Sequence, residues 1–267
     1  MKSIPIDNRI RLEDSKVSNN SYWEKSTPWA FKTEGLSYED RRKLRYELQD
    51  YMFEAIGFDQ YKGKKVLEIG CGAGIDSVEF ARHGAIVTAI DFTENAVNLT
   101  KKSFREAGVK AVEVLKCDAS ELKFPDKSFD LVYSFGVLHH IKQIDNVLSD
   151  ISRILNETGE GVFMVYNRDS LLNAYSILFL HRDEQLSEDE LATRYSERNA
   201  GNPYTKLYSK KEAEELFGKY FLKVDVSTYF GVIDVVNERK VKIVAPQQLG
   251  WHHIVKCKGP IRSSKTK

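Results

Sequence analysis

The chain has 267 residues, with 40 lysine and arginine residues against 39 aspartate and glutamate residues, so its formal net charge is +1. This balance provides no overall field that would gather nucleic acid or an acidic membrane surface. The length suits one large domain, or one domain with a cap. The three cysteines, Cys71, Cys117 and Cys257, are scattered and form no CxxC pair, so we expect neither a disulfide framework nor a metal site.

The first sixty residues are expected to form an arm followed by a helix. Ser37 and Asp40 have the spacing of a capping box, and Gly57 is placed to end a helix over Ser37–Gly57. An apolar stripe at helical spacing would pack this helix on the neighbouring domain. The stripe consists of Leu44, Leu48, Tyr51, Met52, Ala55 and Ile56.

The N-terminal sequence lacks the apolar middle region of a signal peptide. The longest apolar run, residues 170–180, is far too short to cross a bilayer as a helix. We therefore expect a cytoplasmic protein without a membrane span.

From Lys64 onward, short apolar strands alternate with helices. Strands are expected at Lys65–Ile69, Ile86–Ile90, Val112–Leu115, Phe129–Ser134, Glu160–Tyr166, Phe221–Tyr229 and Trp251–Cys257. Helices are expected at Ile75–His83, Thr93–Ala107 and Asp145–Leu155, and from Ser209 onward. This rhythm is typical of right-handed βαβ units. The predicted fold class is α/β, a doubly wound Rossmann-like sheet of seven mostly parallel strands.

The segment 167–207 interrupts this rhythm. It carries an apolar helix at Ser170–Phe179, a capped polar helix that starts near Ser187, and a Gly-Asn-Pro turn at Gly201–Pro203. We expect a helical cap inserted over the edge of the sheet where ligands bind. The expected domains are an N-terminal arm and helix acting as a lid (1–60) and a main domain (61–267) that contains the cap.

A glycine-rich loop, Gly70-Cys71-Gly72-Ala73-Gly74, directly follows the first predicted strand. Ligands of open α/β sheets bind beyond the carboxyl ends of the strands. Glycine is needed where the backbone approaches a ligand closely or turns through positive φ. The GxGxG spacing is one residue tighter than the dinucleotide fingerprint, and no Lys-Ser/Thr pair follows, which excludes a Walker-type phosphate loop.

Two aspartates follow the next two predicted strands. Asp91 ends the second strand, where a carboxylate can accept charge-assisted hydrogen bonds from a ribose diol. Asp118 follows the third strand, within reach of an exocyclic amine of a purine. One adenosine could therefore contact all three strand ends.

The motifs of Lys64–Tyr166 resemble the ordered binding motifs of class I S-adenosylmethionine-dependent methyltransferases. They read "VLEIGCGAG", "AID", "KCDA" and "FDLVYSFGVLHHI", and "VLHHI" is similar to the small-molecule branch that includes ubiquinone- and menaquinone-biosynthesis methyltransferases. The resemblance implies S-adenosylmethionine as the cofactor, with Gly70, Gly72 and Gly74 at its methionine end. It further implies Asp91 on the ribose, Asp118 on the adenine amine and Ser134 under the sulfonium, in a pocket completed by Glu68, Cys71, Phe92 and Ala119.

The implied reaction is an in-line transfer of the methyl group to an oxygen, nitrogen or carbon atom of a small organic acceptor. His139 and His140 are candidate general bases, of which at most one faces the substrate because adjacent side chains diverge. Positioning or packing is the alternative role for both. Candidate acceptor-binding residues are Tyr22, Trp29, Tyr166, Tyr175 and Tyr208.

Two other functions remain as alternatives. An RNA or protein acceptor is disfavoured because the segment "YSFGVLHH" has neither the Asn/Asp-Pro-Pro-aromatic motif of base-amine methylation nor paired glutamates. No nucleic-acid partner is expected. A non-catalytic subunit that only binds the cofactor is the second alternative, and the intact glycine loop favours an enzyme instead. The sequence carries no signal for an oligomeric state.

Overall fold

The computed structural model describes residue 23 and residues 35–196, 204–230, 232–234, 242–244 and 247–262. A seven-stranded sheet forms the centre, in the order β3-β2-β1-β4-β5-β9-β6. Its strands are Lys65–Ile69 (β1), Ile86–Asp91 (β2), Glu113–Lys116 (β3), Phe129–Phe135 (β4), Leu155–Tyr166 (β5), Phe221–Tyr229 (β6) and His252–Pro260 (β9). Strand β9 is antiparallel to both of its neighbours, and the pairs from β3 to β5 are parallel. The predicted α/β class and the mostly parallel seven-stranded sheet are confirmed.

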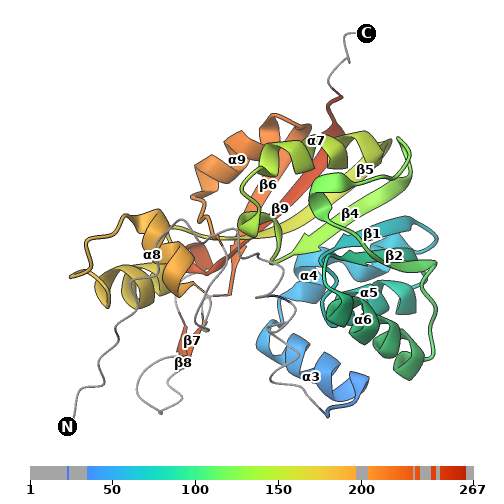
Figure 1. The fold of residues 1–267 in the computed structure, drawn as a ribbon, viewed down its shortest axis with the longest axis horizontal. Helices are drawn as coiled ribbons and strands as arrows, with labels where there is room; N and C mark the ends of the chain where they lie inside the picture. Colours follow the sequence, from blue (N-terminus) through green and yellow to red (C-terminus); the bar gives the residue numbers. More distant parts are fainter. Residues whose placement is uncertain are drawn as a thin grey trace.

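Helices cover both faces of the sheet (Figure 1). Helices α5 (Ile75–Arg82) and α6 (Glu94–Ala107) lie on one face, with α3 (Tyr38–Leu48) and α4 (Met52–Ile56) beside them. Helices α7 (Ile144–Ile154) and α9 (Lys210–Gly218) lie on the other face. The carboxyl ends of the parallel strands are left open between these layers, which is where ligands of such sheets bind.

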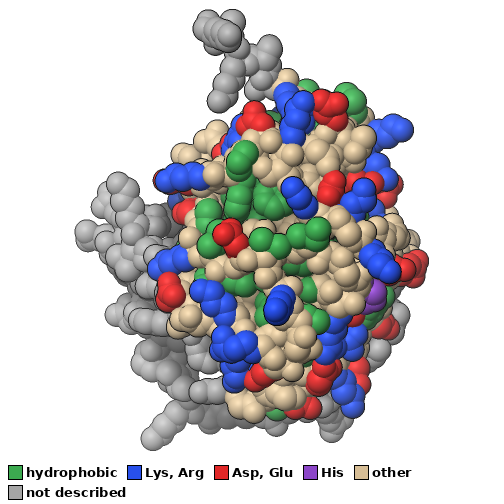
Figure 2. All heavy atoms as spheres, turned by 90° about the vertical axis from the view of Figure 1, so that its right-hand side faces the viewer, with side chains coloured by type: hydrophobic (Ala, Val, Ile, Leu, Met, Phe, Trp, Pro, Cys, Tyr) green, Lys and Arg blue, Asp and Glu red, His purple; other side chains and the backbone are tan. Residues whose placement is uncertain are grey.

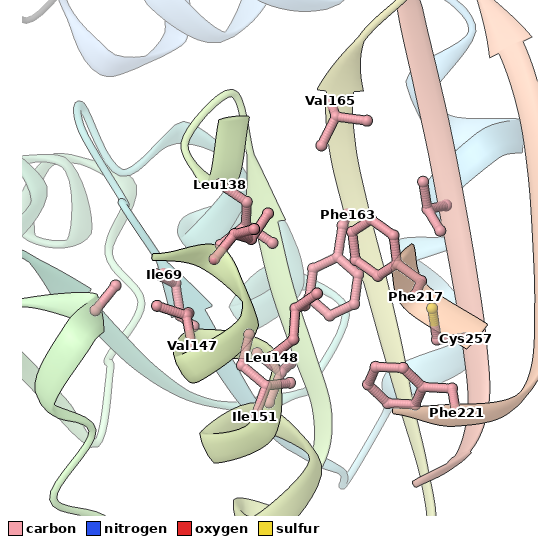
Figure 3. Close-up of a cluster of buried hydrophobic side chains, with 14 of the residues drawn as sticks. Ile69, Leu138, Val147, Leu148, Ile151, Phe163, Val165, Phe217, Phe221 and Cys257 are labelled. Atoms are coloured by element: carbon pink, nitrogen blue, oxygen red, sulfur yellow. The ribbon is translucent and has the colours of Figure 1, made fainter. Parts of the chain in front are cut away.

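One apolar cluster fixes the second helical layer to the sheet (Figure 3). Val147, Leu148 and Ile151 of α7 are fully buried in this cluster. The ring of Phe217 from α9 stacks on Phe163 of β5, with centroids 5.3 Å apart. Burying one such side chain contributes about 1.5–3 kcal/mol. This packing attaches α7 and α9 to the face of the sheet formed by β4 and β5.

The N-terminal helix differs from the prediction. The expected helix over Ser37–Gly57 is wrong, because α3 and α4 are separate. The capping box of Ser37 and the helix end at Gly57 are confirmed. Leu44 and Leu48 are 37% and 50% exposed, while α3 buries Arg41 and Arg45 instead. These arginines pair with Glu106 and Asp76 of the neighbouring helices, and apolar periodicity does not reveal such pairing.

The C-terminal half contains three further differences. Strand β5 begins at Leu155, earlier than expected, and a short hairpin of β7 (Val232–Asp234) and β8 (Lys242–Val244) lies between β6 and β9 in sequence. The apolar segment Asn173–Phe179 (η5) is a π-helix. Helix α8 (Glu188–Tyr195) begins at Ser187 with the expected cap. The segment 167–207 has a small core of its own, formed by Ile177, Leu191, Ala192 and Leu207 together with Trp251.

Among the helices that the structure describes, none combines the length and the apolar composition of a membrane span.

Candidate active site

A cavity of about 510 Å³ lies at the carboxyl ends of the parallel strands. Its walls come from the ends of four neighbouring strands and the loops after them: residues 68–73 (β1), 91–93 (β2), 117–120 (β3) and 135–137 (β4). The strand order reverses between β1 and β4. Open α/β sheets bind ligands at such a reversal, and the volume is typical of small-molecule sites.

The glycine loop after β1 is a tight turn that only glycine fits. Gly70, Gly72 and Gly74 have φ angles of 76°, 52° and 71°. The amides of Gly70 and Cys71 both donate to the carbonyl of Ile90, at 2.8 and 3.0 Å. A Cβ atom on Gly70 would lie 2.2 Å from Cγ2 of Val137. The loop is therefore pressed between β2 and the loop after β4, with its backbone along the cavity.

Asp91 connects the glycine loop to the start of α6. Its Oδ2 accepts a hydrogen bond from the Gly72 amide at 3.0 Å. Its Oδ1 accepts from the amide and the hydroxyl of Thr93, at 3.0 and 2.9 Å. The carboxylate lines the cavity although the residue is buried.

Asp118 is the more exposed of the two aspartates. Its Oδ1 accepts hydrogen bonds from the amide and the hydroxyl of Ser120, both at 2.8 Å. Both aspartates thus cap local turns, and both also line the cavity. The capping role does not exclude contact with a ligand, because a carboxylate has several acceptor positions.

The other expected cofactor residues divide into two groups. Cys71, Phe92 and Ala119 line the cavity, and so does Glu68, which accepts a hydrogen bond from the Ser77 hydroxyl. Burial, and next the charge of Asp76, raise the pKa of Glu68 well above its usual value. Ser134 and Gly74 lie outside the lining: the Ser134 hydroxyl donates to the Ile69 carbonyl at 2.9 Å, and Gly74 packs against Thr100.

An ion pair that sequence reasoning missed forms part of the wall. Arg45 donates from Nε and Nη2 to the Asp76 carboxylate, at 2.9 and 2.6 Å, and from Nη1 to Gln49 at 2.9 Å. The hydroxyls of Tyr46 and Tyr133 donate to the same carboxylate. The Arg45 guanidinium lies 4.6 Å from the centre of the Phe135 ring. No local pattern pairs Arg45 with Asp76, because 31 positions separate them.

Of the two candidate bases, only His140 lines the cavity. His139 is fully buried against the ring of Tyr166, and burial lowers its pKa well below the usual value. Nδ1 of His140 lies 3.0 Å from the Tyr204 carbonyl and 3.0 Å from the Thr205 hydroxyl. Because a carbonyl only accepts hydrogen bonds, Nδ1 carries the hydrogen and Nε2 of the neutral ring carries the lone pair.

The rest of the wall is largely aromatic. Trp23 packs against His140, with ring centroids 5.1 Å apart, and Phe135, Met164 and Tyr166 complete this side. Of the expected acceptor-binding residues that the structure describes, only Tyr166 lines the cavity. Tyr208 is buried beside it, with its amide on the Tyr166 carbonyl, and Tyr175 stacks on Phe179 outside the cavity. Tyr22 and Trp29 lie outside the described residues.

His252 also lines the cavity and was missed. It is the first residue of β9, which runs opposite to the other strands that surround it. An antiparallel strand begins at the edge where its parallel neighbours end, so its first residues reach the ligand side. The signal in the sequence was a second histidine pair, "WHHIV", at the start of the last predicted strand.

The charges of the wall suit a cationic ligand. Asp76, Asp91 and Asp118 supply three carboxylates, against two cations from Arg45 and Lys142. Arg45 is already paired with Asp76. A pyrophosphate would meet this acidic wall unfavourably, whereas a nucleoside with a positive sulfonium is compatible with it. The glycine backbone, the two aspartates and the apolar side chains of Phe92 and Ala119 together fit S-adenosylmethionine.

Comparison with known proteins also indicates a methyltransferase domain. A sequence profile described as "Methyltransferase domain" matches residues 67–163. A fatty-acid O-methyltransferase of Mycolicibacterium smegmatis is 33% identical over 153 residues, which cover 56% of this chain and 53% of that protein. A ubiquinone biosynthesis O-methyltransferase of Coxiella burnetii is 28% identical over 123 residues, covering 44% of this chain and 50% of that protein. The chain spans about half the length of the curated relatives it matches.

The fold agrees with a solved structure. A SAM-dependent methyltransferase from Aquifex aeolicus superimposes with a TM-score of 0.52 at 20% identity, covering 80% of this chain and 92% of that one. This likeness shows a shared fold. The profile match identifies residues 67–163 as a methyltransferase domain, and the cavity that this domain lines fits S-adenosylmethionine as its cofactor.

Proposed function

We propose that the protein transfers a methyl group from S-adenosylmethionine to a small organic acceptor that binds in the aromatic part of the cavity. One observation carries this proposal. A single cavity joins the glycine loop, Asp91 and Asp118 on one side to Trp23, Phe135, Met164 and Tyr166 on the other. The first group matches a nucleoside cofactor, and the second offers rings and a thioether to an apolar partner.

The cofactor-side residues have separate roles in this proposal. Asp91 accepts hydrogen bonds from the ribose hydroxyls, and Asp118 accepts one from the adenine amine. The backbone of Gly70 and Gly72 lies along the methionine part. Their positive φ angles and the close approach of Val137 support this assignment, because a side chain at Gly70 would fill the space.

The reaction requires little covalent help from the chain. The bound cofactor supplies a methyl group on a positively charged sulfur atom. The aromatic wall excludes water and holds the acceptor close to that group and in line with the departing sulfur, which can provide most of the rate enhancement. His140 accepts the proton of a hydroxyl acceptor on Nε2, while its Nδ1–H stays on the Tyr204 carbonyl.

The N-terminal residues act as a lid in this proposal. Trp23, Arg45 and Gln49 belong to the segment 1–60 and line the cavity. The cap segment 167–207 acts indirectly: none of its described residues lines the cavity, but Tyr204 and Thr205 hold His140. Closure of the N-terminal segment would exclude water during transfer.

A small acceptor is favoured over a nucleic acid by the charges. Basic and acidic side chains are interspersed on the face drawn in Figure 2, and the net charge of the chain is +1. Two of the relatives are named for fatty-acid and ubiquinone-biosynthesis O-methylation, and an organic hydroxyl or carboxyl group is the acceptor chemistry of this proposal.

Two measurements test the proposal. Calorimetry with S-adenosylmethionine should show binding to one site, and NAD should not compete. Cell extract is then incubated with the protein and S-adenosylmethionine bearing a deuterated methyl group, and labelled products are sought by mass spectrometry. A labelled small molecule supports the proposal. Cofactor binding without any labelled product, from extract as well as from complexes purified with the protein, would identify a non-catalytic subunit instead.

A further inference from the structure

His252 stands on the cavity wall as a neutral imidazole. Burial, and next the charge of Arg45, lowers the pKa of His252 to about 3. The ring therefore carries one N–H and one lone pair at physiological pH. Which nitrogen carries the hydrogen determines what the ring offers to a ligand.

Tyr51 fixes that choice. Its hydroxyl lies 2.6 Å from Nδ1 of His252, and this is its hydrogen-bond partner among the described residues. Burial raises the pKa of Tyr51, so the phenol keeps its hydrogen. The hydroxyl donates to Nδ1, which places the lone pair of His252 on Nδ1 and the hydrogen on Nε2.

The Nε2–H group is available to a ligand. Within the described part of the chain, Nε2 of His252 has no hydrogen-bond partner, and His252 lines the cavity. The adjacent His253 points to the opposite face of β9, where its Nδ1 is hydrogen-bonded to the Thr228 hydroxyl. Its Nε2 is enclosed by protein. The two neighbours on one strand therefore provide an internal contrast.

Three rings hold the orientation of His252. Phe230 stacks on it with centroids 4.6 Å apart and planes 7° apart, and Tyr166 lies nearly parallel at 6.1 Å. Phe135 meets it edge-on at 5.5 Å. A donor whose direction is fixed in advance loses little entropy on binding, and it is more valuable in an apolar wall than in water.

We propose that His252 is an acceptor-binding residue, which donates a hydrogen bond from Nε2 to an oxygen atom of the methyl acceptor, and that Tyr51 is the positioning residue that fixes its tautomer. The proposal rests on the proposed function, because it places the acceptor in the aromatic part of the cavity. The two histidines then differ at Nε2: His252 carries a hydrogen there, whereas His140 carries a lone pair. The acceptor class is an apolar or aromatic compound with an oxygen that can accept a hydrogen bond.

The test uses histidine-labelled full-length protein and NMR of the imidazole nitrogens. Without ligand, the spectrum should show His252 protonated on Nε2. With S-adenosylhomocysteine bound, acetophenone is the probe, because its carbonyl only accepts hydrogen bonds, and isopropylbenzene is the matched hydrocarbon. Acetophenone should shift the Nε2–H signal of His252 and leave that of His253 in place, and it should bind about fivefold more tightly than isopropylbenzene.

Two variants separate the roles. In His252→Phe the preference for acetophenone should disappear, while affinity for S-adenosylhomocysteine stays within about twofold. In Tyr51→Phe the spectrum should show both tautomers of His252, and the preference should fall. Protonation of Nδ1 in the wild type, equal shifts with both probes, or an unchanged preference in His252→Phe would overturn the proposal. If the wild-type protein does not bind S-adenosylhomocysteine, the proposed function is refuted instead. The ligand-free spectrum still reports the tautomer of His252, so the two failures can be distinguished.

Discussion

The backbone amide of Gly72 donates a hydrogen bond to Oδ2 of Asp91 at 3.0 Å. The glycine loop after β1 and the aspartate at the end of β2 are therefore one hydrogen-bonded unit. Oδ1 of the same carboxylate anchors Thr93, which caps α6. A change at Asp91 consequently acts on the cofactor and on the protein backbone together.

The first prediction is that Asp91→Ala weakens S-adenosylmethionine binding by about 1.5–3 kcal/mol, or about 10- to 150-fold in Kd, because a hydrogen-bonded charge is lost. It should also lower the free energy of unfolding, since Gly72 and Thr93 lose their shared acceptor. Calorimetry and urea unfolding measure the two effects. Asp118→Ala is the comparison: it should weaken binding with a smaller loss of stability, because Asp118 holds only its own turn. Unchanged affinity in folded Asp91→Ala would contradict the ribose assignment.

The second prediction concerns Gly70→Ala. The new Cβ would lie 2.2 Å from Cγ2 of Val137, and the residue would be held at a φ of 76°. Cofactor affinity should fall by at least about tenfold, because either the glycine loop or the loop after β4 must move. Gly63→Ala is the matched control, since Gly63 has a φ of 73° and nothing within 4 Å of its Cβ position. It should cost only the backbone strain of about 1 kcal/mol and leave the Kd unchanged.

The third prediction concerns the buried ion pair of the cavity wall. Asp76→Ala removes the acceptor for Arg45, Tyr46 and Tyr133 at once. Leaving a charge buried without its partner should lower the free energy of unfolding by about 3–5 kcal/mol. Lys43→Ala breaks the exposed pair with Glu47, whose side chains are 73% and 60% exposed, and should change stability by less than about 0.5 kcal/mol. Equal effects in urea unfolding would show that burial of the Arg45 pair is unimportant.

The sequence predicted those parts of the fold that depend on local chemistry. Alternating apolar strands and helices, the capping residues Ser37, Ser187 and Ser209, and the glycine turn all follow from short-range patterns. The sequence predicted a helix after Ser37 but not its break before α4 or the buried face of α3, because that face is made by arginines whose partners lie on other helices. Long-range charge pairing leaves no periodic signal.

The candidate site likewise contains residues that the sequence predicted and residues that it did not. Residues directly after parallel strands, such as Asp91 and Asp118, were placed by the rule that ligands bind at the carboxyl ends. Arg45 and His252 reach the same cavity from an N-terminal helix and from an antiparallel strand. Their positions depend on the path of the chain in three dimensions, so a reading based on parallel strand ends could not include them.

The fourth prediction distinguishes the two adjacent histidines. His140→Ala should lower kcat for a hydroxyl acceptor by about 10²–10⁴-fold, because His140 lines the cavity and its Nδ1 hydrogen is held on the Tyr204 carbonyl. Added imidazole should restore part of the rate. His139→Ala should leave the pH profile of kcat/KM unchanged and lower stability instead, because its ring is buried against Tyr166. An unaltered pH profile in His140→Ala would remove it as a base.

The last prediction is a loss of stability in mild acid. Burial lowers the pKa of His252 to about 3 and of His253 to about 4, and holds that of His139 well below its usual value. In the unfolded chain each histidine titrates near pH 6.5, at about the reference value. Between about pH 6.5 and 4 the unfolded state therefore binds up to three protons more than the folded state. This contribution to stability is complete above about pH 6.5 and is lost as the pH falls toward the folded values.

Glu68 acts in the opposite direction. Burial raises its pKa well above the usual value, so the folded state keeps a proton that the unfolded state releases above about pH 4.5. The proton on Glu68 therefore opposes the histidine protons, which the unfolded state gains as the pH falls below about 6.5. The free energy of unfolding should fall over this range, with a contribution of about 1.4 kcal/mol per pH unit from each histidine proton taken up, measured by urea unfolding. His253→Gln should reduce that slope by about 1.4 kcal/mol per unit, because one of the three histidine protons no longer contributes. If the slope stays the same in this variant, His253 is already protonated in the folded protein, and the acid sensitivity must come from other groups.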